Sequence, residues 1–463
     1  MGLFKNRQQP GREAMATEPV RSLLLKMAAP SIVAMLMQAM YNTVDSMYVA
    51  RISDGSLAAV TIAFPVQMIM GALSTGIGVG INSCISRNLG AKDPKEAGAA
   101  AANGLTLGLV TVVIMALFGI FGAEPFVRMY TSDPEVVANG IVYVRTICLL
   151  GFGSIFCQLS FSVLQGSGSM LIPMVSQIAG GLFVIMLDPI FIFGLGLGVQ
   201  GAAIASSLAQ IIGMAIGMFG IFVQNKENLP VTFRGFRPDF ALMKDILSVG
   251  IPSALTQCTT SVVAGIVNKQ IAIYGTEAIT LYGSYTKLSS FVTLPIFGIT
   301  RGMNPILGFA CGEQNANRFK ETRNFALKLA FVWTAACFAV FQLMPTMLLA
   351  LMNIKGELVQ TGITTYRLLS ISMPVIGLSI VMTQQFPPLK KSYLTMISAL
   401  LRQIVFLLPL TILMRNLIGV NGIWIGIQMA DYLNFVFVTC VTLWVDKKIL
   451  SKWVPETERD YSI

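Results

Sequence analysis

Long apolar stretches separated by short polar segments make up most of the chain. A helix that crosses the hydrocarbon core of a bilayer needs about 20 mostly apolar residues. Twelve stretches meet this length: 27–49, 57–83, 97–122, 136–163, 170–194, 201–223, 246–273, 278–303, 324–350, 360–386, 393–415 and 421–445. The segments between them carry turn and charge signals such as Gly90-Ala91-Lys92-Asp93-Pro94. The pattern predicts an all-α integral membrane protein with 12 transmembrane helices.

Composition narrows the function classes. The chain is 54% hydrophobic and 12% charged, with a mean hydropathy of +0.71, whereas soluble domains carry about 25% charged residues. A soluble domain and a disordered chain are therefore excluded. The sequence has no histidine, and its seven cysteines form no CxxC pair, so we expect no metal centre. We expect no enzyme and no organic cofactor. No P-loop lysine follows the glycine-rich runs, so ATP is not expected to bind.

The net charge of +10 could indicate nucleic acid, but its distribution favours membrane topology. With twelve spans, both termini lie on one side. We count 21 of the 32 Lys and Arg on that side and 7 on the other, with the rest inside spans or at their ends. Because Lys and Arg concentrate in cytoplasmic loops, we expect both termini in the cytoplasm of a bacterial cell and the helices in its cytoplasmic membrane. We expect no nucleic-acid partner.

The chain partly matches itself at a shift of 222 residues. Pro30-Ser31 falls on Pro252-Ser253, and Gly90-Ala91-Lys92-Asp93 falls on Gly312-Glu313-Gln314-Asn315. We therefore expect a six-helix bundle in residues 1–225, a cytoplasmic linker loop in 226–245, and a second six-helix bundle in 246–463. Six is an even number, so the two bundles enter the membrane in the same direction, as parallel repeats of a transporter do.

A polar stripe on the first span includes an acid. Gln38, Asn42 and Asp45 are spaced i, i+4 and i+7, which places them on one helix face. Such a stripe must face protein or water rather than lipid. We interpret Asp45 as a cation or proton site facing a cavity; the alternative is an aspartate near the outer membrane interface.

Asp188 lies in the fifth span, directly before Pro189. Proline removes a backbone donor and disturbs the helix, and Gln177 and Val184 share a helix face with Asp188. Ionisable residues inside spans are costly and usually mark ion or substrate pathways. We interpret Asp188 as a second ion-coupling carboxylate; the alternative is a cap at a helix break.

Other polar positions lie in the C-terminal half. Asp431 and Arg402 are candidates for a structural ion pair. Lys287 is a candidate cavity-lining residue that either tunes a site electrostatically or extends to the interface. A further stripe on the seventh span is a candidate cavity lining, made of Gln257, Ser261 and Asn268.

These features resemble the multidrug and toxic compound extrusion (MATE) family over about residues 20–450, most closely its bacterial MepA-like branch. The most specific segments are Tyr41 to Arg51 (YNTVDSMYVAR), Leu187 to Phe193 (LDPIFIF), Gly198 to Ala205 (GVQGAAIA) and Leu400 to Gln403 (LLRQ). The resemblance implies a V-shaped fold of two six-helix bundles. It also implies efflux of cationic amphipathic compounds in exchange for H+ or Na+.

Site residues follow from the resemblance position by position. The family's coupling aspartates fall on Asp45 and Asp188, which makes Na+ an alternative to the proton there. A helix 6 hydroxyl falls on Ser206 and a helix 4 tyrosine on Tyr143. The chain departs from the family pattern at Val184, at Arg301 and at Pro387-Pro388.

The sequence thus predicts a secondary antiporter, with a small-molecule cation as substrate and the lipid bilayer as its surroundings, working as a monomer. One rival is a flippase for a lipid-linked saccharide, which would need basic residues for a pyrophosphate. Another is a non-transporting receptor or scaffold, for which the expected large soluble domain is missing. A channel is a third, less suited to the repeat and the acids inside the spans. The substrate's identity and the choice between H+ and Na+ stay open.

Overall fold

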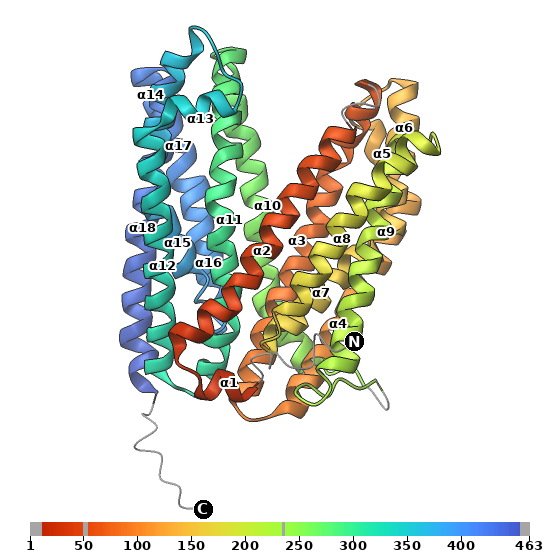
Figure 1. Cartoon of the computed structure of the whole chain (residues 1–463), viewed down its shortest axis with the longest axis vertical. Helices are drawn as coiled ribbons and strands as arrows, with labels where there is room; N and C mark the ends of the chain where they lie inside the picture. Colours follow the sequence, from red (N-terminus) through yellow and green to blue (C-terminus); the bar gives the residue numbers. More distant parts are fainter. Residues whose placement is uncertain (1–11, 50–53, 234–236, 454–463) are drawn as a thin grey trace, which may run out of the picture.

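The computed structural model describes residues 12–49, 54–233 and 237–453, and within these ranges the chain is helical and contains no strand. Two groups of helices lean against each other at the end that holds α1 and the end of α18. They diverge toward the opposite end, so the ribbon has the outline of a V (Figure 1). The predicted fold class, an all-α membrane protein in two helix bundles, is confirmed.

The first group is built from twelve described segments, nine α-helices and three short π-helical segments labelled η. They are α1 (Arg12–Thr17), α2 (Val20–Val49), α3 (Asp54–Gly90), α4 (Pro94–Leu117), η1 (Phe118–Gly122), α5 (Ala123–Arg128), α6 (Pro134–Leu149), α7 (Phe152–Gly166), α8 (Leu171–Pro189), η2 (Ile190–Gly194), α9 (Gly198–Phe219) and η3 (Gly220–Gln224).

The second group is built from eleven described segments. They are α10 (Phe240–Ala272), α11 (Thr276–Gly312), α12 (Ala316–Leu343), α13 (Pro345–Leu351), α14 (Leu358–Ser370), α15 (Met373–Thr383), α16 (Ser392–Leu400), η4 (Leu401–Leu407), α17 (Leu408–Ile418), α18 (Val420–Lys448) and η5 (Leu450–Lys452). Because α10 begins inside the segment expected as a linker, the division at 226–245 stays a prediction.

Eleven helical runs among the described residues are long and apolar enough to cross a membrane, against the twelve predicted. The difference is the predicted span 278–303, which lies within α11. That helix has 37 residues, about 55 Å at 1.5 Å per residue, so it is long enough. Its charged residues, Lys287 and Arg301 among them, lower its hydropathy. This helix packs against α2, α3 and α12 rather than standing alone in lipid.

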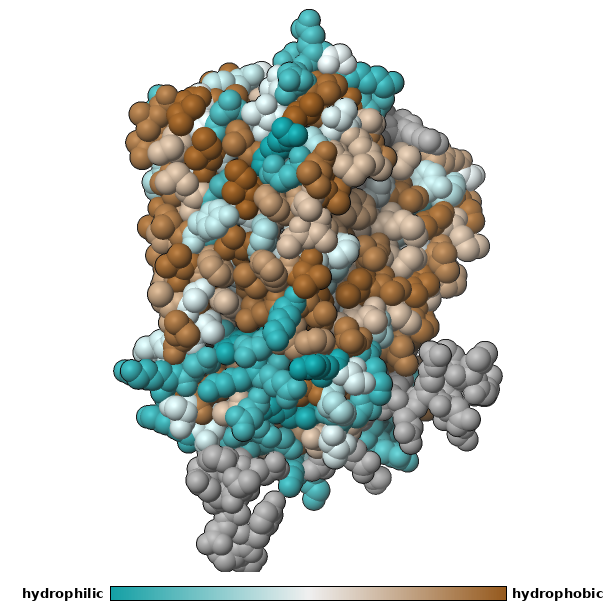
Figure 2. All heavy atoms as spheres, turned by 60° about the vertical axis from the view of Figure 1, so that its left-hand side comes forward, coloured by the Kyte–Doolittle hydropathy of each residue, from teal (hydrophilic) through white to brown (hydrophobic). Residues whose placement is uncertain are grey.

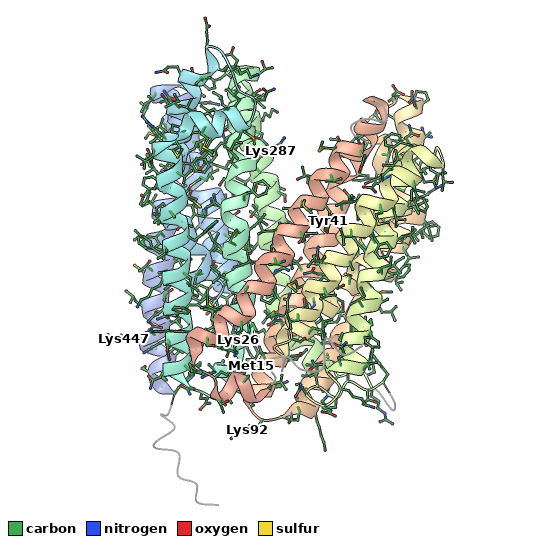
Figure 3. The ribbon with its side chains drawn as sticks, in the orientation of Figure 1. Met15, Lys26, Tyr41, Lys92, Lys287 and Lys447 are labelled. Carbon is green, nitrogen blue, oxygen red and sulfur yellow. The ribbon has the colours of Figure 1, made fainter. Side chains whose placement is uncertain are left out.

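The surface shows how the protein lies in a bilayer. Figure 2 shows a broad apolar band and, toward the lower end, a belt of hydrophilic side chains. Lys26, Lys92 and Lys447 lie at this same lower end, and Met15 of α1 lies beside them (Figure 3). The apolar band matches the hydrocarbon region, so the chain is a multi-pass membrane protein.

The internal repeat is visible in the backbone of two turns. Lys92 and Gln314 both adopt a positive φ, of 63° and 55°. The residue after each caps the next helix: Asp93 accepts a hydrogen bond from Glu96 N at 2.9 Å, and Asn315 accepts one from Arg318 N at 3.0 Å. The turns therefore repeat at the shift of 222 residues found in the sequence.

The two helix groups meet through α2 against α11 and α3 against α10. Glycines allow this close approach. A Cβ on Gly302 of α11 would lie 2.7 Å from the backbone N of Ala28, and one on Gly250 of α10 would lie 2.9 Å from the carbonyl O of Gly76. Contacts this short leave no room for a side chain, so the backbones nearly touch where the V closes.

Candidate functional site

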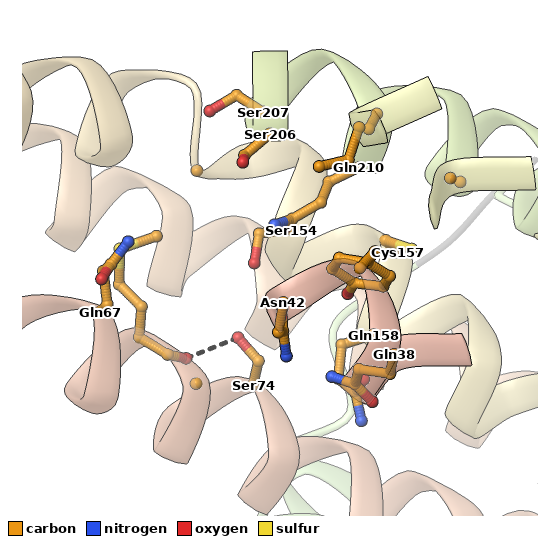
Figure 4. A pocket seen from close by; sticks show the side chains of 18 of the residues that line it. Gln38, Asn42, Gln67, Ser74, Ser154, Cys157, Gln158, Ser206, Ser207 and Gln210 are labelled. Atoms are coloured by element: carbon orange, nitrogen blue, oxygen red, sulfur yellow. Dashed lines mark hydrogen bonds between the residues drawn. The ribbon is translucent and has the colours of Figure 1, made fainter. Parts of the chain in front are cut away.

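A cavity of about 360 Å³ lies inside the first helix group, between α2, α3, α6, α7, α8 and α9. Figure 4 shows side-chain amides and hydroxyls turned toward it from several helices. Among the described residues that line it, none is acidic or basic. The polar lining residues are Gln38, Tyr41, Asn42, Gln67, Ser74, Thr75, Tyr143, Ser154, Gln158, Ser176, Gln177, Ser206, Ser207 and Gln210.

Five residues predicted from the sequence lie around this cavity: Gln38, Asn42, Tyr143, Gln177 and Ser206.

Two of these predicted residues, Gln177 and Tyr143, form hydrogen bonds between the helices that surround the cavity. Gln177 on α8 donates a hydrogen bond of 3.2 Å to the hydroxyl of Tyr41 on α2. Gln67 on α3 donates one of 3.3 Å to the hydroxyl of Tyr143 on α6. Small-molecule sites are usually lined by apolar side chains with a few polar groups that fix the ligand's orientation. This cavity is more polar than that, since each of its six helices contributes at least one polar side chain.

Sequence reasoning missed several lining residues, although a signal for them was present. Gln67 and Ser74 are spaced i, i+7 on α3, with Gly71 at i+4. Ser154 and Gln158 are spaced i, i+4 on α7, and Ser206 and Gln210 repeat this spacing on α9. The stripe argument used for the first span would have found these helix faces too.

Asp188 is fully buried near the end of α8. It is not among the residues that line the cavity, but Val184, one turn earlier on α8, is. The α-helix ends at Pro189 and continues as the π-helical η2, with Leu195 N donating to Ile190 O at 2.8 Å. Breaks of this kind are frequent at functional sites, so the carboxylate lies beside an irregular helix segment just beyond the cavity.

The side chain of Asp45 lies outside the described residues, but its position on α2 is set by the neighbours. A Cβ on Gly181 of α8 would lie 3.0 Å from Cδ1 of Tyr41. The rings of Tyr48 and Phe193 are 6.4 Å apart. These two contacts show that α2 and the segment from α8 into η2 lie side by side and run in the same direction. Position 45 lies between Tyr41 and Tyr48, and Asp188 lies between Gly181 and Phe193, so the two positions are at a similar level.

The two charged residues considered as a pair in the second half do form an ion pair. Arg402 in η4 contacts Asp431 on α18, with 2.7 Å between Nη2 and Oδ1. Ser372 donates a hydrogen bond of 2.8 Å to the other carboxylate oxygen of Asp431. This carboxylate is thus held by a cation and a hydroxyl, as a structural group would be.

The remaining predicted lining residues lie elsewhere. Gln257 and Asn268 are exposed on α10, and Ser261 donates to the carbonyl of Gln257 at 3.3 Å. Lys287 is exposed on α11, toward the end where the two helix groups diverge (Figure 3). None of these four lines the main cavity or the two smaller cavities beside it, so their role stays a prediction.

Two smaller cavities, of about 60 and 10 Å³, lie between the helix groups. Both are lined by Arg301 of α11 and Gln165 of α7, and Pro387 and Pro388 line the larger one. Two of the three sequence departures, Arg301 and the Pro387-Pro388 segment, thus meet at one place. The third, Val184, faces the main cavity.

No cluster of His, Cys, Asp or Glu suited to a metal is found within the described ranges. The arrangement can bind an organic molecule through amides, phenols and apolar surface, and it places one buried carboxylate next to that space. It holds no nucleophile paired with a base of the kind used in catalysis among the described lining residues.

A helical membrane protein with two similar halves and a polar cavity in one of them has the features of a transporter. The MatE family model matches the chain twice, at residues 30–190 and 252–413, so the chain belongs to the MatE family. The two matched ranges start 222 residues apart, in agreement with the repeat.

Relatives cover almost the whole chain. The multidrug export protein MepA of Staphylococcus aureus (strain MRSA252) is 23% identical over 423 residues, which is 90% of this chain and 92% of that protein. MepA of Staphylococcus saprophyticus is 22% identical over 88% of this chain and 90% of its own length.

Solved structures agree with this fold. A multidrug resistance MATE family transporter in an outward-facing conformation superimposes with a TM-score of 0.88 at 26% identity, covering 95% of this chain and 100% of that one. A MATE structure in complex with MaL6 gives the same TM-score and identity over 94% of this chain and 99% of that one.

Proposed function

We propose that this protein exports cationic, amphipathic small molecules by secondary antiport, taking in H+ or Na+ in exchange through alternating access. The observation that carries the proposal is the buried Asp188 beside the 360 Å³ polar cavity of the first helix group. Position 45 lies at the same level of that group. The relatives named as multidrug export proteins support export of small-molecule drugs.

The proposed coupling is competition for negative charge. An ionised carboxylate removed from water is stable only with a counter-charge. A bound organic cation or an incoming H+ or Na+ can serve as that counter-charge for Asp188, Asp45 or both. Entry of one favours release of the other, which supplies the differential affinity that a coupled switch needs. Protonation would also change the packing of α2 on α8 and so favour one facing state.

The arrangement of the helices gives the proposed direction. The helix groups are closed at the end rich in Lys and Arg, where we place the cytoplasm with both termini, and they diverge at the other end. This conformation would be the outward-facing one of a bacterial cytoplasmic-membrane protein. We propose that the monomer is the working unit, since each chain has its own cavity and its own pair of acids.

The test is efflux from proteoliposomes. The purified chain is reconstituted with ethidium inside, and a pH gradient or a sodium gradient is imposed separately. We expect export under one gradient and none without a gradient, and Asp45→Asn should insert normally but lose export. Absence of export under both gradients, together with movement of a fluorescent lipid-linked saccharide, would favour the flippase instead.

A further inference from the structure

Arg301 lines two small cavities that adjoin the main cavity. The cavity of about 60 Å³ that it lines shares Thr75 and Gln158 with the main cavity. The smallest cavity, also lined by Arg301, shares Gln38 and Gln177 with the main one. Because the cavities have lining residues in common, Arg301 lies next to the space that a ligand in the main cavity would occupy.

Arg301 is partly buried, and it differs from three other buried or partly buried arginines. Arg87, Arg323 and Arg402 each contact a carboxylate, with N to O distances of 2.6–2.7 Å. Arg301 has no ion pair or side-chain hydrogen bond with any residue in the described part of the chain. A guanidinium that is partly withdrawn from water gains from an anionic partner, so a negative group from outside the chain would be stabilised next to Arg301.

The side chains around Arg301 are hydrogen-bond donors without a partner of their own. Asn82, Gln158, Gln165 and Asn304 line the 60 Å³ cavity, and their amides make no side-chain hydrogen bond within the described residues. The Oδ1 atom of Asn304 is buried without a hydrogen-bond partner. This oxygen is an acceptor and calls for a donor, so only the amide nitrogens of these four side chains can donate to an anionic ligand. No acid is among the described residues that line this space.

The charges beneath the cavity add to its positive field. Ser83 lines the cavity and accepts a hydrogen bond of 3.0 Å from Arg87. Arg87 and Lys390 both contact Asp245, so this cluster holds two cations and one carboxylate. A guanidinium with several amide donors and no competing acid is suited to a carboxylate or a similar single anionic group.

We propose that Arg301, with Asn82, Gln158, Gln165 and Asn304, forms a subsite for an anionic group of the exported compound. The preferred substrates are then amphiphilic zwitterions, whose cation and apolar body occupy the main cavity. The inference rests on the proposed export function and makes its substrate class more specific. The volume of about 60 Å³ exceeds the ~10–15 Å³ that a single water needs by the same measure, so the cavity has room for a small anionic group such as a carboxylate.

The subsite is built by both helix groups. Asn82 comes from α3 and Gln158 and Gln165 from α7, whereas Arg301 and Asn304 come from α11. An anion bound there would hold α11 against the first group in the conformation described here. It would be released when the groups separate at this end, so binding of the anion also favours this facing state.

The test compares a rhodamine that carries a free carboxylate with its methyl ester, two probes that differ by one anionic group. Binding to the full-length protein in a phosphatidylcholine-containing detergent is followed by fluorescence anisotropy. A charge-assisted pair contributes enough for about tenfold tighter binding of the free acid. We expect Arg301→Gln to remove this preference while the ester keeps its affinity, and Arg301→Lys to keep part of it.

Arg415→Gln is the matched control, because it makes the same change in the last turn of α17, far from these cavities in the fold. It should leave both affinities unchanged. Unchanged ester binding also shows that a variant is folded. Equal binding of acid and ester by the wild type, or a preference that survives Arg301→Gln, would overturn the subsite even if ethidium export is observed. If neither probe binds and ethidium is not exported, the proposed function fails as well.

A second arm separates a substrate carboxylate from a lipid phosphate. Phosphatidylglycerol is added to the same binding assay. A preference for the free acid that persists supports the substrate subsite. If the lipid abolishes the preference in the wild type, Arg301 binds a lipid headgroup and the proposal for the substrate is wrong.

Discussion

Arg87 on α3 and Asp245 on α10 form an ion pair that joins the two helix groups, with 2.7 Å between Nη2 and Oδ2. Lys390 adds a second contact of 2.9 Å to the same carboxylate oxygen. Ser83 donates a hydrogen bond of 2.8 Å to the carbonyl of Pro387 and so ties α3 to the same loop. This cluster fastens the V at its closed end, where alternating access would require it to separate.

Asp245→Asn should loosen the closed end. Removing one partner of a largely buried ion pair costs about 2–5 kcal/mol, enough to raise the population of states separated at this end by more than tenfold. Hydrogen exchange of backbone amides near the ends of α3 and α10 measures this. Glu124→Gln is the control, because Glu124 pairs with Arg128 at an exposed i, i+4 position, where a pair contributes little. Equal exchange in both variants would contradict the role of the cluster.

Gly302→Ala should destabilise the contact between α11 and α2. The added Cβ would lie 2.7 Å from the backbone N of Ala28, so one helix must shift. Overpacking of this kind costs about 1–3 kcal/mol and should lower the thermal unfolding midpoint in detergent. Gly283→Ala on the same helix is the control, since a Cβ there meets nothing within 4 Å. The idea fails if the two variants unfold at the same temperature.

Asp431→Asn should lower stability without changing ion coupling. The substitution leaves Arg402 without its carboxylate in a partly buried position, at a cost of about 3–5 kcal/mol for such a pair. The unfolding midpoint should fall, while the gradient that drives export stays the same. Asp431→Asn combined with Arg402→Met should recover part of the loss. A change of driving ion in the single variant would show that the pair takes part in coupling.

The fold followed from apolar periodicity because long apolar helices have few alternatives in a bilayer. α11 is the informative exception. Its charged positions reduce its apolar character, and it is covered by α2, α3 and α12 rather than by lipid alone. The family resemblance pointed to Arg301 as a charge at the cytoplasmic mouth of the cavity. Apolar periodicity alone placed a helix at 278–303 but could not show that Arg301 lies between the two helix groups, because that depends on packing across α2.

The cavity was partly predictable. Gln38 and Asn42 emerged from spacing on one helix, and the same rule applied to α3, α7 and α9 would have added Gln67, Gln158 and Gln210. Helix spacing alone cannot tell which of several polar faces turn toward one another. The stripe with Gln257 also begins with an i, i+4 pair and stays on one helix face, yet it lines none of the three cavities described above.

Competition between a cation and a proton at the buried acids is the central claim, and proton release on binding measures it directly. Ethidium is added to the detergent-solubilised protein in weak buffer near neutral pH, and the pH change is recorded with and without sodium. If the coupling ion is H+, wild-type protein should release protons when ethidium binds. If it is Na+, ethidium should bind less tightly as the sodium concentration rises. Asp188→Asn and Asp45→Asn should lose part or all of this response. Ethidium binding that is independent of pH and sodium, and unchanged in both variants, would contradict the account.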